Sequence, residues 1–390
     1  QAAVASWNNT SLCQAAIDYA WARGVTVVAS AGEGGSDASA FPGACERTVQ
    51  VSALSAYRDA ALPAAEQFPS SYLYLGSRTG YGPHTAVSCP SEGEASGAAG
   101  RVAGIAGLLY SAALDKVRRG ELWLYPGTEE PLSANEVKQL LCMTADDIDF
   151  SPDGYGSTFG ALDAAIGPSG RYPTDGGWDA YTGYGRVNAY EAVQAVSEGR
   201  IPPEAEIRSP RWSELVNPGQ VWLDINARVA AVRADSFQYT VEWRVGADPS
   251  EGDWRALENS DTRFGVVEGV VATLDLGEVY RALQEAVQAQ EAAQIREAAA
   301  DPGRYAFTVR VRVRDEAGNW GEDRKTLFCL DDPDAYPGAP VRLEAGVSGS
   351  PRFADLDGDG RDELIVATAD GLVHALRQDF REIEGWPAHT

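Results

Sequence analysis

The sequence predicts an α/β domain built on a parallel sheet, then an all-β sandwich, then the start of a β-propeller-type repeat. Residues 25–29 form a continuous apolar run after a helical pattern, as expected for a parallel strand buried on both faces. From Glu204 apolar and polar residues alternate, which is typical of half-buried antiparallel strands. Aspartates alternate with glycines over residues 355–363. The expected domains are residues 1–201, 202–335 and 336–390.

The composition limits the partners of the chain. It has 57 acidic and 32 basic residues, and its net charge is −25 at pH 7. A chain this acidic is repelled by nucleic acid and by anionic membrane surfaces. No apolar run has the length of a transmembrane helix. We therefore expect no nucleic-acid partner and no membrane span.

The first elements follow the order helix, strand, loop and strand. Ser11 and Gln14 have the spacing of a capping box that opens a helix, and Gly24 ends that helix. The strand at 25–29 leads into a Gly/Ser loop that contains Glu33. A second strand is expected at 48–53. The apolar face expected for the helix consists of Ala15, Ala16, Tyr19 and Ala20.

Ser96 opens a run of small residues that continues as an apolar helical segment, 105–113. Unpaired N–H groups and the positive end of the helix dipole favour negative charge at such a position. Small residues allow the helix to be buried deeply. This pattern suits a nucleophilic serine, although a serine that only caps a core helix has the same pattern.

Two further helices are marked by their caps. Ser133 and Glu136 form a second capping box before the apolar segment 137–143. Asn188 can cap a last helix, 190–196, which Gly199 ends.

These segments, in this order, resemble those of the subtilisin-like (S8 family) serine proteases. The run from Ser96 to Val102-Ala-Gly104 is similar to the family's Gly-Thr-Ser-x-Ala-x-Pro-x-Val-Ala-Gly, with Glu94, Ala95 and Gly100 as departures. The segment 183–189, Gly-Tyr-Gly-Arg-Val-Asn-Ala, resembles the family's closing motif. The resemblance covers residues 1–199 and implies that Ser96 is the catalytic serine of a subtilisin-like domain.

The resemblance also implies an aspartate and a histidine that the matching segments do not supply. The family carries both before its oxyanion loop, whereas the three histidines of this chain are His84, His374 and His389. His84 lies in a Gly/Pro-rich segment and is expected to be a solvated loop residue. A serine without its general base is a poor nucleophile. The chain is therefore expected to be the C-terminal part of a protease domain and to be inert by itself.

Glu33 occupies the position at which the family has its oxyanion-hole asparagine. That asparagine donates a side-chain N–H to the tetrahedral oxyanion. An ionised glutamate has only acceptors, whereas a protonated glutamate could donate. Two alternatives follow: Glu33 donates in acid, or Glu33 turns into solvent and backbone N–H groups act alone.

The cysteines leave their pairing open. No pair has metal-ligand spacing, so zinc is not expected. Cys13–Cys45 or Cys89–Cys142 could be disulfides of an exported protein, and buried thiols are the alternative. The five cysteines are Cys13, Cys45, Cys89, Cys142 and Cys329.

A boundary at Pro202-Pro203 introduces the alternating strands. Asp315–Asn319 is expected to be a hairpin turn, and residues 277–300 read as a helix inserted in a loop. The region resembles the immunoglobulin-like or fibronectin-like domains of bacterial secreted proteases. The expected strands are 221–226, 237–243, 305–314 and 325–329.

The last motif is Asp-Leu-Asp-Gly-Asp-Gly-Arg-Asp-Glu at 355–363, before a strand at 364–367. Alternating aspartates on a tight glycine turn converge oxygen ligands on one cation, which suits Ca²⁺. The loop resembles that of FG-GAP/VCBS repeats, of which one is present, so the repeat is expected to be truncated. The expected ligands are Asp355, Asp357, Asp359 and Glu363 with the backbone carbonyl of Arg361.

Two functions fit these patterns. The first is a bacterial endopeptidase, secreted or at the cell surface, that hydrolyses a protein or peptide substrate through a Ser96 acyl-enzyme. The second is a catalytically inactive scaffold of the same fold that acts as a calcium-dependent adhesion or binding protein. In both, the C-terminal modules could bind an extracellular partner.

Overall fold

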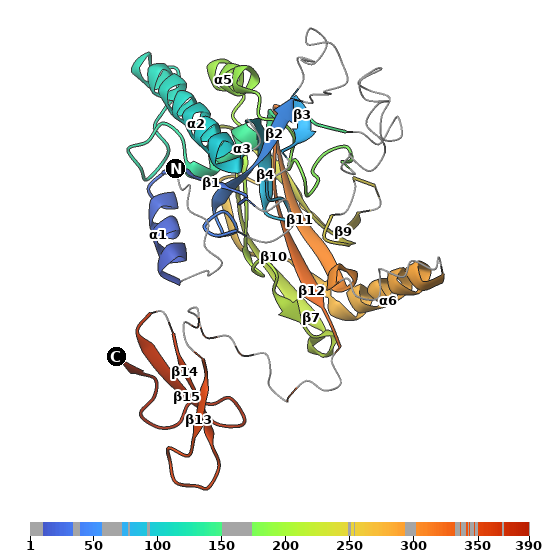
Figure 1. The fold of residues 1–390 in the computed structure, drawn as a ribbon. Coiled ribbons are helices and arrows are strands. Elements are labelled where there is room, and N and C mark those ends of the chain that lie inside the picture. The colour runs from blue at the N-terminus through green and yellow to red at the C-terminus, as the bar shows by residue number, and fades with distance from the viewer. Residues whose placement is uncertain are drawn as a thin grey trace, which may run out of the picture.

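The fold is taken from a computed structural model (Figure 1). It describes residues 11–33, 40–56, 72–76, 79–91, 94–149, 174–248, 251, 252, 254–292, 302–331, 336, 341, 343, 347, 350–368 and 370–389. Statements below about contacts refer to these residues.

The first region is built on a parallel sheet, as the sequence predicts. Its strands are β1 (Val27–Ser30), β2 (Thr48–Ala56) and β4 (Thr85–Pro90). Both β1 and β4 run parallel to β2. A fourth strand, β3 (Tyr72–Leu75), pairs antiparallel with the end of β2 and was not predicted. The apolar residues of β1, β2 and β4 are buried because helices and loops cover the sheet.

Four helices accompany this sheet: α1 (Ser11–Trp21), α2 (Ala95–Arg118), α3 (Ala134–Met143) and α5 (Ala189–Glu198). The capping box of Ser133 and Glu136 opens α3, as predicted. Asn188 caps α5, and Gly199 ends it in the left-handed conformation that glycine adopts without strain. Ala98, Val102 and Leu109 of α2 are fully buried in the core that the sheet shares.

α2 is the only helix in the described part of the chain that is long and apolar enough to cross a membrane. Its packing gives another reason for this composition. The same apolar residues that give the helix its hydropathy lie against β1, β2 and α5. A core helix of a sheet domain passes the same test of length and composition.

The face expected for α1 is wrong. Tyr19 is 63% exposed, and Ala15 and Ala16 are exposed as well. Ile17 is the residue of this helix that is buried. Alanine and tyrosine are weak markers of a face, because an alanine buries little apolar area and a tyrosine is only intermediate in its tendency to be buried.

The second region consists of two sheets that share one core. One has the order β10-β7-β5, the other β6-β12-β11-β8-β9. Buried residues of both sheets belong to a single cluster, which includes Trp243, Phe307 and Ile225. The strands are β5 (Glu204–Ser209), β6 (Leu215–Val216), β7 (Trp222–Ala230), β8 (Phe237–Val245), β9 (Arg255–Asn259), β10 (Val266–Asp275), β11 (Ala306–Asp315) and β12 (Trp320–Cys329). We call residues 204–329 the two-sheet module.

The predicted hairpin is present in this module. β11 and β12 pair antiparallel from Ala306–Phe328 to Arg314–Trp320, and the turn lies between them. Short 3₁₀ turns precede β7 (Pro218–Gln220) and β11 (Pro302–Tyr305).

The helix predicted at 277–300 is present up to Ala292, and residues 293–300 lie outside the described residues. It is not a decoration of a loop. It is α6 (Leu276–Ala292), and it follows β10 directly. Leu276, Val279 and Leu283 are 0–1% exposed and belong to the core of the two sheets. The helix therefore covers the core of the module, and Figure 1 shows it at the end of the strands away from α2 and α5.

The C-terminal residues form a separate antiparallel sheet. Its order is β13 (Arg352–Ala354), β14 (Glu363–Ala367), β15 (Leu372–Leu376) and β16 (Ala388–His389). The acidic loop 355–362 joins β13 to β14, so the predicted strand after this loop is present.

The first region and the two-sheet module are joined by buried polar contacts. The amide of Gln139 on α3 exchanges two hydrogen bonds with the backbone of Glu322, at 3.0 and 3.1 Å. Lys138 pairs with Asp323 at 3.0 Å, and Arg233 pairs with Glu136 at 2.7 Å. Buried polar groups fix one relative geometry because each loses its partner if the regions shift.

Candidate active site and candidate metal centre

Ser96 and Glu33 lie at the carboxyl edge of the parallel sheet. Glu33 follows the end of β1, and Ser96 follows the end of β4. Because parallel strands end at the same edge, the two residues meet although 63 positions separate them. Ser96 is the second residue of α2 and is half-buried, while Glu33 is exposed.

The carboxylate of Glu33 contacts both polar groups of Ser96. Glu33 Oε1 accepts a hydrogen bond from the Ser96 backbone N–H at 3.2 Å. Ser96 Oγ donates to the same oxygen at 3.4 Å. The alternative in which Glu33 turns away into solvent is therefore not the arrangement found.

The loop that carries Glu33 is fixed by the segment before β4. Gly32 N–H donates to Ser30 Oγ at 2.9 Å, and Gly80 N–H donates to the Gly32 carbonyl at 2.8 Å. A Cβ on Gly80 would lie 2.1 Å from the Ala31 carbonyl oxygen, so a side chain at this position would displace the loop. Sequence reasoning missed Gly80, and the Gly-Tyr-Gly run 80–82 was the signal that could have found it.

The start of α2 is fixed in a similar way. Ser91 Oγ donates to the Glu94 carbonyl at 2.9 Å, and a Cβ on Gly97 would lie 2.8 Å from that hydroxyl oxygen. Glu94 is the N-cap residue but makes no side-chain capping bond. The Ser96 N–H is an orphan donor of the first turn, and Glu33 satisfies it from outside the helix.

This arrangement can stabilise negative charge beside a hydroxyl nucleophile. A first-turn N–H and the helix dipole both favour an anion at this point. In the structure the anion is the Glu33 carboxylate itself. An oxyanion that forms at Ser96 would have to displace this carboxylate from the N–H.

His84 is not the solvated loop residue that the sequence suggested. Its ring is half-buried and lies 4.3 Å from the ring of Trp212. Burial, with Lys325 and Lys138 nearby, lowers the pKa of His84 to about 3. The ring precedes β4, so it is at the sheet edge opposite Ser96.

The other two histidines belong to the C-terminal sheet. His374 on β15 pairs through Nδ1 with Glu382 at 2.5 Å. His389 lies on β16 opposite Leu372. Within the described residues, none of the three histidines contacts Ser96.

The cysteines of the first region are buried to different degrees. The Sγ atoms of Cys13 and Cys45 lie 3.9 Å apart, well beyond an S–S bond of about 2.05 Å. Burial, with Cys13 adjacent, raises the pKa of Cys45 to about 12. Cys89 and Cys142 are both buried in the core of the sheet, and burial raises the pKa of Cys142 to about 12.

Three of the expected calcium ligands come together in the loop 355–363. Carboxylate oxygens of Asp355, Asp357 and Glu363 all lie within 4.8 Å of one another. Gly358 and Gly360 adopt φ values of 78° and 84°, which produce the tight turn. Hard carboxylate oxygens at this separation fit a divalent cation such as Ca²⁺.

The remaining members of the expected ligand set are placed differently. Asp359 is outside the group, and its Oδ1 accepts from the Arg361 N–H at 2.8 Å. Arg377 pairs with Asp357 Oδ2 at 2.8 Å and occupies one side of that carboxylate.

The fold defines a class, an α/β domain in which a serine lies at the start of a helix at the carboxyl edge of a parallel sheet. Residues 3–185 match the sequence model of the subtilase family. The matched stretch, slightly less than half of the chain, contains the α/β region with the parallel sheet.

Solved structures of proteases of this type are also similar. One is a lanthipeptide protease, with 20% identity, a TM-score of 0.30, and coverage of 47% of this chain and 54% of that chain. Another is the prenylagaramide maturation protease PagA, with 15% identity, a TM-score of 0.33, and coverage of 50% of this chain and 60% of that chain. The subtilisin-like protease Apa1 of Pseudoalteromonas sp. AS-11 has 12% identity, a TM-score of 0.29, and coverage of 50% of this chain and 69% of that chain. The chain spans little more than half the length of the first two. No curated protein matches the chain.

Proposed function

We propose that this chain is part of a subtilisin-like serine endopeptidase in which Ser96 is the nucleophile. The observation that carries the proposal is the position of Ser96 at the start of α2, at the carboxyl edge of the sheet, within the stretch that matches the subtilase family. Ser96 Oγ attacks the scissile carbonyl of a protein or peptide substrate and forms an acyl-enzyme. The first-turn N–H of α2 faces the negative charge that develops.

The proton of Ser96 Oγ needs an acceptor when the bond to the carbonyl carbon forms. We propose that an aspartate and a histidine from a segment of the parent protein outside these 390 residues complete the site. Support comes from the placement of the histidines, because His84 lies at the opposite edge of the sheet and His374 is paired with Glu382. The 390-residue chain alone should then be inert.

The test is covalent labelling of the parent protein, expressed with the coding sequence that precedes Gln1, by a fluorophosphonate probe. Ser96→Ala should abolish labelling, and Ser111→Ala is the matched control because it removes an exposed hydroxyl from the same helix, far from its start. Undiminished labelling of Ser96→Ala would remove Ser96 as the nucleophile.

The alternative function is that of a catalytically inactive scaffold that binds a partner. The specific observation in its favour is the Glu33 carboxylate, which holds the Ser96 N–H that an oxyanion would use. Under this alternative the parent protein resists the probe even when an upstream histidine is present. Labelling of the unmutated parent protein therefore separates the two functions.

We also propose that the loop 355–363 binds Ca²⁺ through Asp355, Asp357 and Glu363, with Asp359 and the Arg361 carbonyl as further ligands. The convergence of three carboxylates supports this site. The ligand set resembles that of an FG-GAP/VCBS-like repeat at 336–390, beside an immunoglobulin-like or fibronectin-like sandwich at 202–335. Such modules suit a secreted or cell-surface protein, which also accords with the acidic surface.

Isothermal titration of the chain with CaCl₂ tests the site. Asp357→Ala should lower the number of bound ions by one, whereas Asp379→Ala, an exposed aspartate outside the loop, should not. An unchanged stoichiometry in Asp357→Ala would show that the loop is a plain acidic turn.

A further inference from the structure

A cavity of about 740 Å³ lies between the first region and the two-sheet module. Its walls include α1, the start of β2 and the start of β4 on one side, and β5 and β12 on the other. Thr48 and Thr85, the first residues of β2 and β4, are among its lining residues. The cavity is therefore at the amino edge of the parallel sheet, opposite the edge that carries Ser96 and Glu33.

Arg324 of β12 lines this cavity and is only 4% exposed. Its guanidinium lies over the ring of Trp178, 4.2 Å from the ring centre, and 5.3 Å from that of Trp254. None of its three guanidinium nitrogens has a hydrogen-bond partner among the described residues. A buried guanidinium with unused N–H donors is costly, because those donors have lost water and gained no acceptor.

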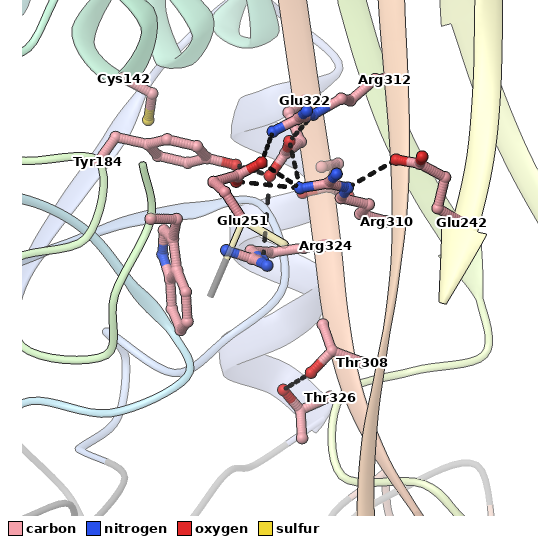
Figure 2. Close-up of polar contacts among 12 residues, drawn as sticks. Cys142, Tyr184, Glu242, Glu251, Thr308, Arg310, Arg312, Glu322, Arg324 and Thr326 are labelled. Carbon is pink, nitrogen blue, oxygen red and sulfur yellow. Dashed lines mark hydrogen bonds and ion pairs between the residues drawn. The ribbon is translucent and has the colours of Figure 1, made fainter. Parts of the chain in front are cut away.

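Glu322, with which Arg324 forms an ion pair, does not supply that acceptor. Glu322 Oε1 is 3.9 Å from Arg324 Nε, beyond hydrogen-bond distance. Figure 2 shows that Glu322 is already engaged by other groups. Tyr184 donates its hydroxyl to Glu322 at 2.7 Å, and Arg312 Nε donates to it at 2.5 Å.

Other cations of the cavity wall contrast with Arg324. Lys325 pairs with Glu46 at 2.6 Å, Lys138 pairs with Asp323 at 3.0 Å, and Arg47 pairs with Glu206 at 2.6 Å. Their charges are balanced within the protein. The ion pair of Arg324 with Glu322 is a 3.9 Å contact without a hydrogen bond, so the N–H donors of Arg324 are left for an acceptor that enters the cavity.

A second polar group of the same wall is also unused. Thr48 is 7% exposed, and its hydroxyl has no hydrogen-bond partner in the described part of the chain. The wall is otherwise rich in rings, since Trp21, Phe41, Trp178 and Trp212 all line the cavity. Aromatic walls with a few polar groups are typical of sites for small molecules.

We propose that this cavity binds a small aromatic monocarboxylate, whose carboxylate pairs with Arg324 and whose ring lies among the aromatic side chains. The two oxygens of a carboxylate match two N–H donors of one guanidinium edge, which gives a bidentate pair. A second negative charge is disfavoured, because Glu322, Glu46 and Asp323 all line the same cavity. The site does not depend on the peptidase proposal.

Benzoate and benzamide are a matched pair of probes for the 390-residue chain. They have the same ring and nearly the same shape, but only benzoate carries the charge that Arg324 requires. Benzoate should raise the melting temperature in a concentration-dependent way, and calorimetry should give a dissociation constant in the millimolar range or below. Benzamide and inorganic phosphate at the same concentration should leave the melting temperature unchanged.

Two variants assign the effect to Arg324. Arg324→Leu should weaken benzoate binding about tenfold or more, because a charge-assisted pair is lost. Arg314→Leu removes the same charge from an exposed position on β11 and should bind benzoate as the unmutated chain does. If Arg324→Leu still binds benzoate with unchanged affinity, the proposal is overturned.

Two other outcomes would also overturn it. Equal stabilisation by benzoate and benzamide would show that the rings bind and that Arg324 contributes no charge recognition. No response of the unmutated chain to benzoate, together with a large loss of stability in Arg324→Leu, would mean that an acceptor of the chain itself already fills the site.

Discussion

A glutamate lies against a hydrogen-bond donor at each edge of the parallel sheet, in opposite environments: Glu33 follows β1 of that sheet, and Glu322 comes from β12 of the two-sheet module. At the carboxyl edge Glu33 is exposed and contacts Ser96 at 3.2 and 3.4 Å. At the amino edge Glu322 is 1% exposed and accepts from Tyr184 and Arg312 at 2.7 and 2.5 Å. The contacts are of the same chemical kind, but water competes only with the first.

This difference in exposure indicates which contacts stabilise the folded state and which can be exchanged for water or a substrate. A buried carboxylate has lost its hydration, so each of its protein partners must replace a hydrogen bond to water. An exposed carboxylate regains water when its partner is removed, and its contact contributes little. Substitutions at the amino edge should therefore lower the free energy of unfolding strongly, whereas substitutions at the carboxyl edge should change it little.

The largest effect is expected for Glu322→Gln. The substitution removes the buried negative charge that Arg312 and Arg324 face. Arg312 keeps its pair with Glu251, whereas Arg324 loses the carboxylate that faces it. We expect a loss of about 3–5 kcal/mol in the free energy of unfolding, as for other broken buried ion pairs. Urea unfolding followed by tryptophan fluorescence measures it. Glu268→Gln, which breaks the exposed pair with Arg208, is the control and should cost less than about 1 kcal/mol.

A second effect concerns Asp179, which is 1% exposed beside Trp178 of the cavity. Burial raises the pKa of Asp179 from 3.8 to about 7, against hydrogen bonds from Thr182 and Tyr181 that lower it. The folded state therefore holds this proton more tightly than the unfolded state. The resulting stability is complete below pH 3.8 and is lost as the pH rises through about 7.

Asp179→Asn should remove this part of the pH dependence. The free energy of unfolding of the unmutated chain should fall by roughly 2–4 kcal/mol relative to the variant between pH 4 and 7. Urea titrations at half-unit pH intervals measure the difference. A difference that is independent of pH would show that the pKa of Asp179 is not raised by its burial.

A third, smaller effect has the opposite sign and concerns His84. Burial lowers the pKa of His84 from 6.5 to about 3, so the unfolded chain binds the proton more readily. Stability is present above pH 6.5 and is lost as the pH falls towards 3. His84→Phe keeps a ring against Trp212 and should remove a loss of about 1–3 kcal/mol on acidification. If His84→Phe and the unmutated chain lose the same stability in acid, the ring is solvated in the folded state.

The sequence predicted the carboxyl edge better than the amino edge, for a physical reason. Ser96 and Glu33 follow strands of a parallel sheet, and their meeting requires only that those strands end at one edge. The capping residues Ser133 and Asn188 were predictable because a cap acts within one helical turn. Local geometry of this kind leaves its signature in short segments.

The cavity at the amino edge leaves no such signature. Arg324 and Trp178 are 146 positions apart in the sequence. The alternation of residue types along a strand such as β12 predicts only that some of its charged side chains face water. In the structure the whole run from Glu322 to Lys325 is buried, because α3 and the first region pack on this strand. The same packing explains why His84 is not fully solvated. The ring that contacts it belongs to Trp212, so the residues next to His84 in the sequence give no sign of this burial.

The smallest effect on stability is expected for Glu33→Gln, which makes at the carboxyl edge the same substitution as Glu322→Gln. Glutamine Oε1 can still accept from the Ser96 N–H, so only the interaction of a full charge with the helix dipole is lost. This interaction contributes about 0.3–1 kcal/mol at an exposed helix start. Urea unfolding should therefore show a loss of at most about 1 kcal/mol.

The same variant should have the opposite effect on the reactivity of Ser96 in the parent protein. An ionised glutamate competes with the oxyanion for the Ser96 N–H, whereas the glutamine amide can donate a second hydrogen bond to it. We expect faster labelling of Glu33→Gln by the fluorophosphonate probe at pH 7, by about tenfold or more, since a single donor of this kind contributes roughly 2.7–4 kcal/mol, a figure measured on subtilisin. Equal labelling rates would show that Glu33 caps α2 and takes no part in stabilising the oxyanion.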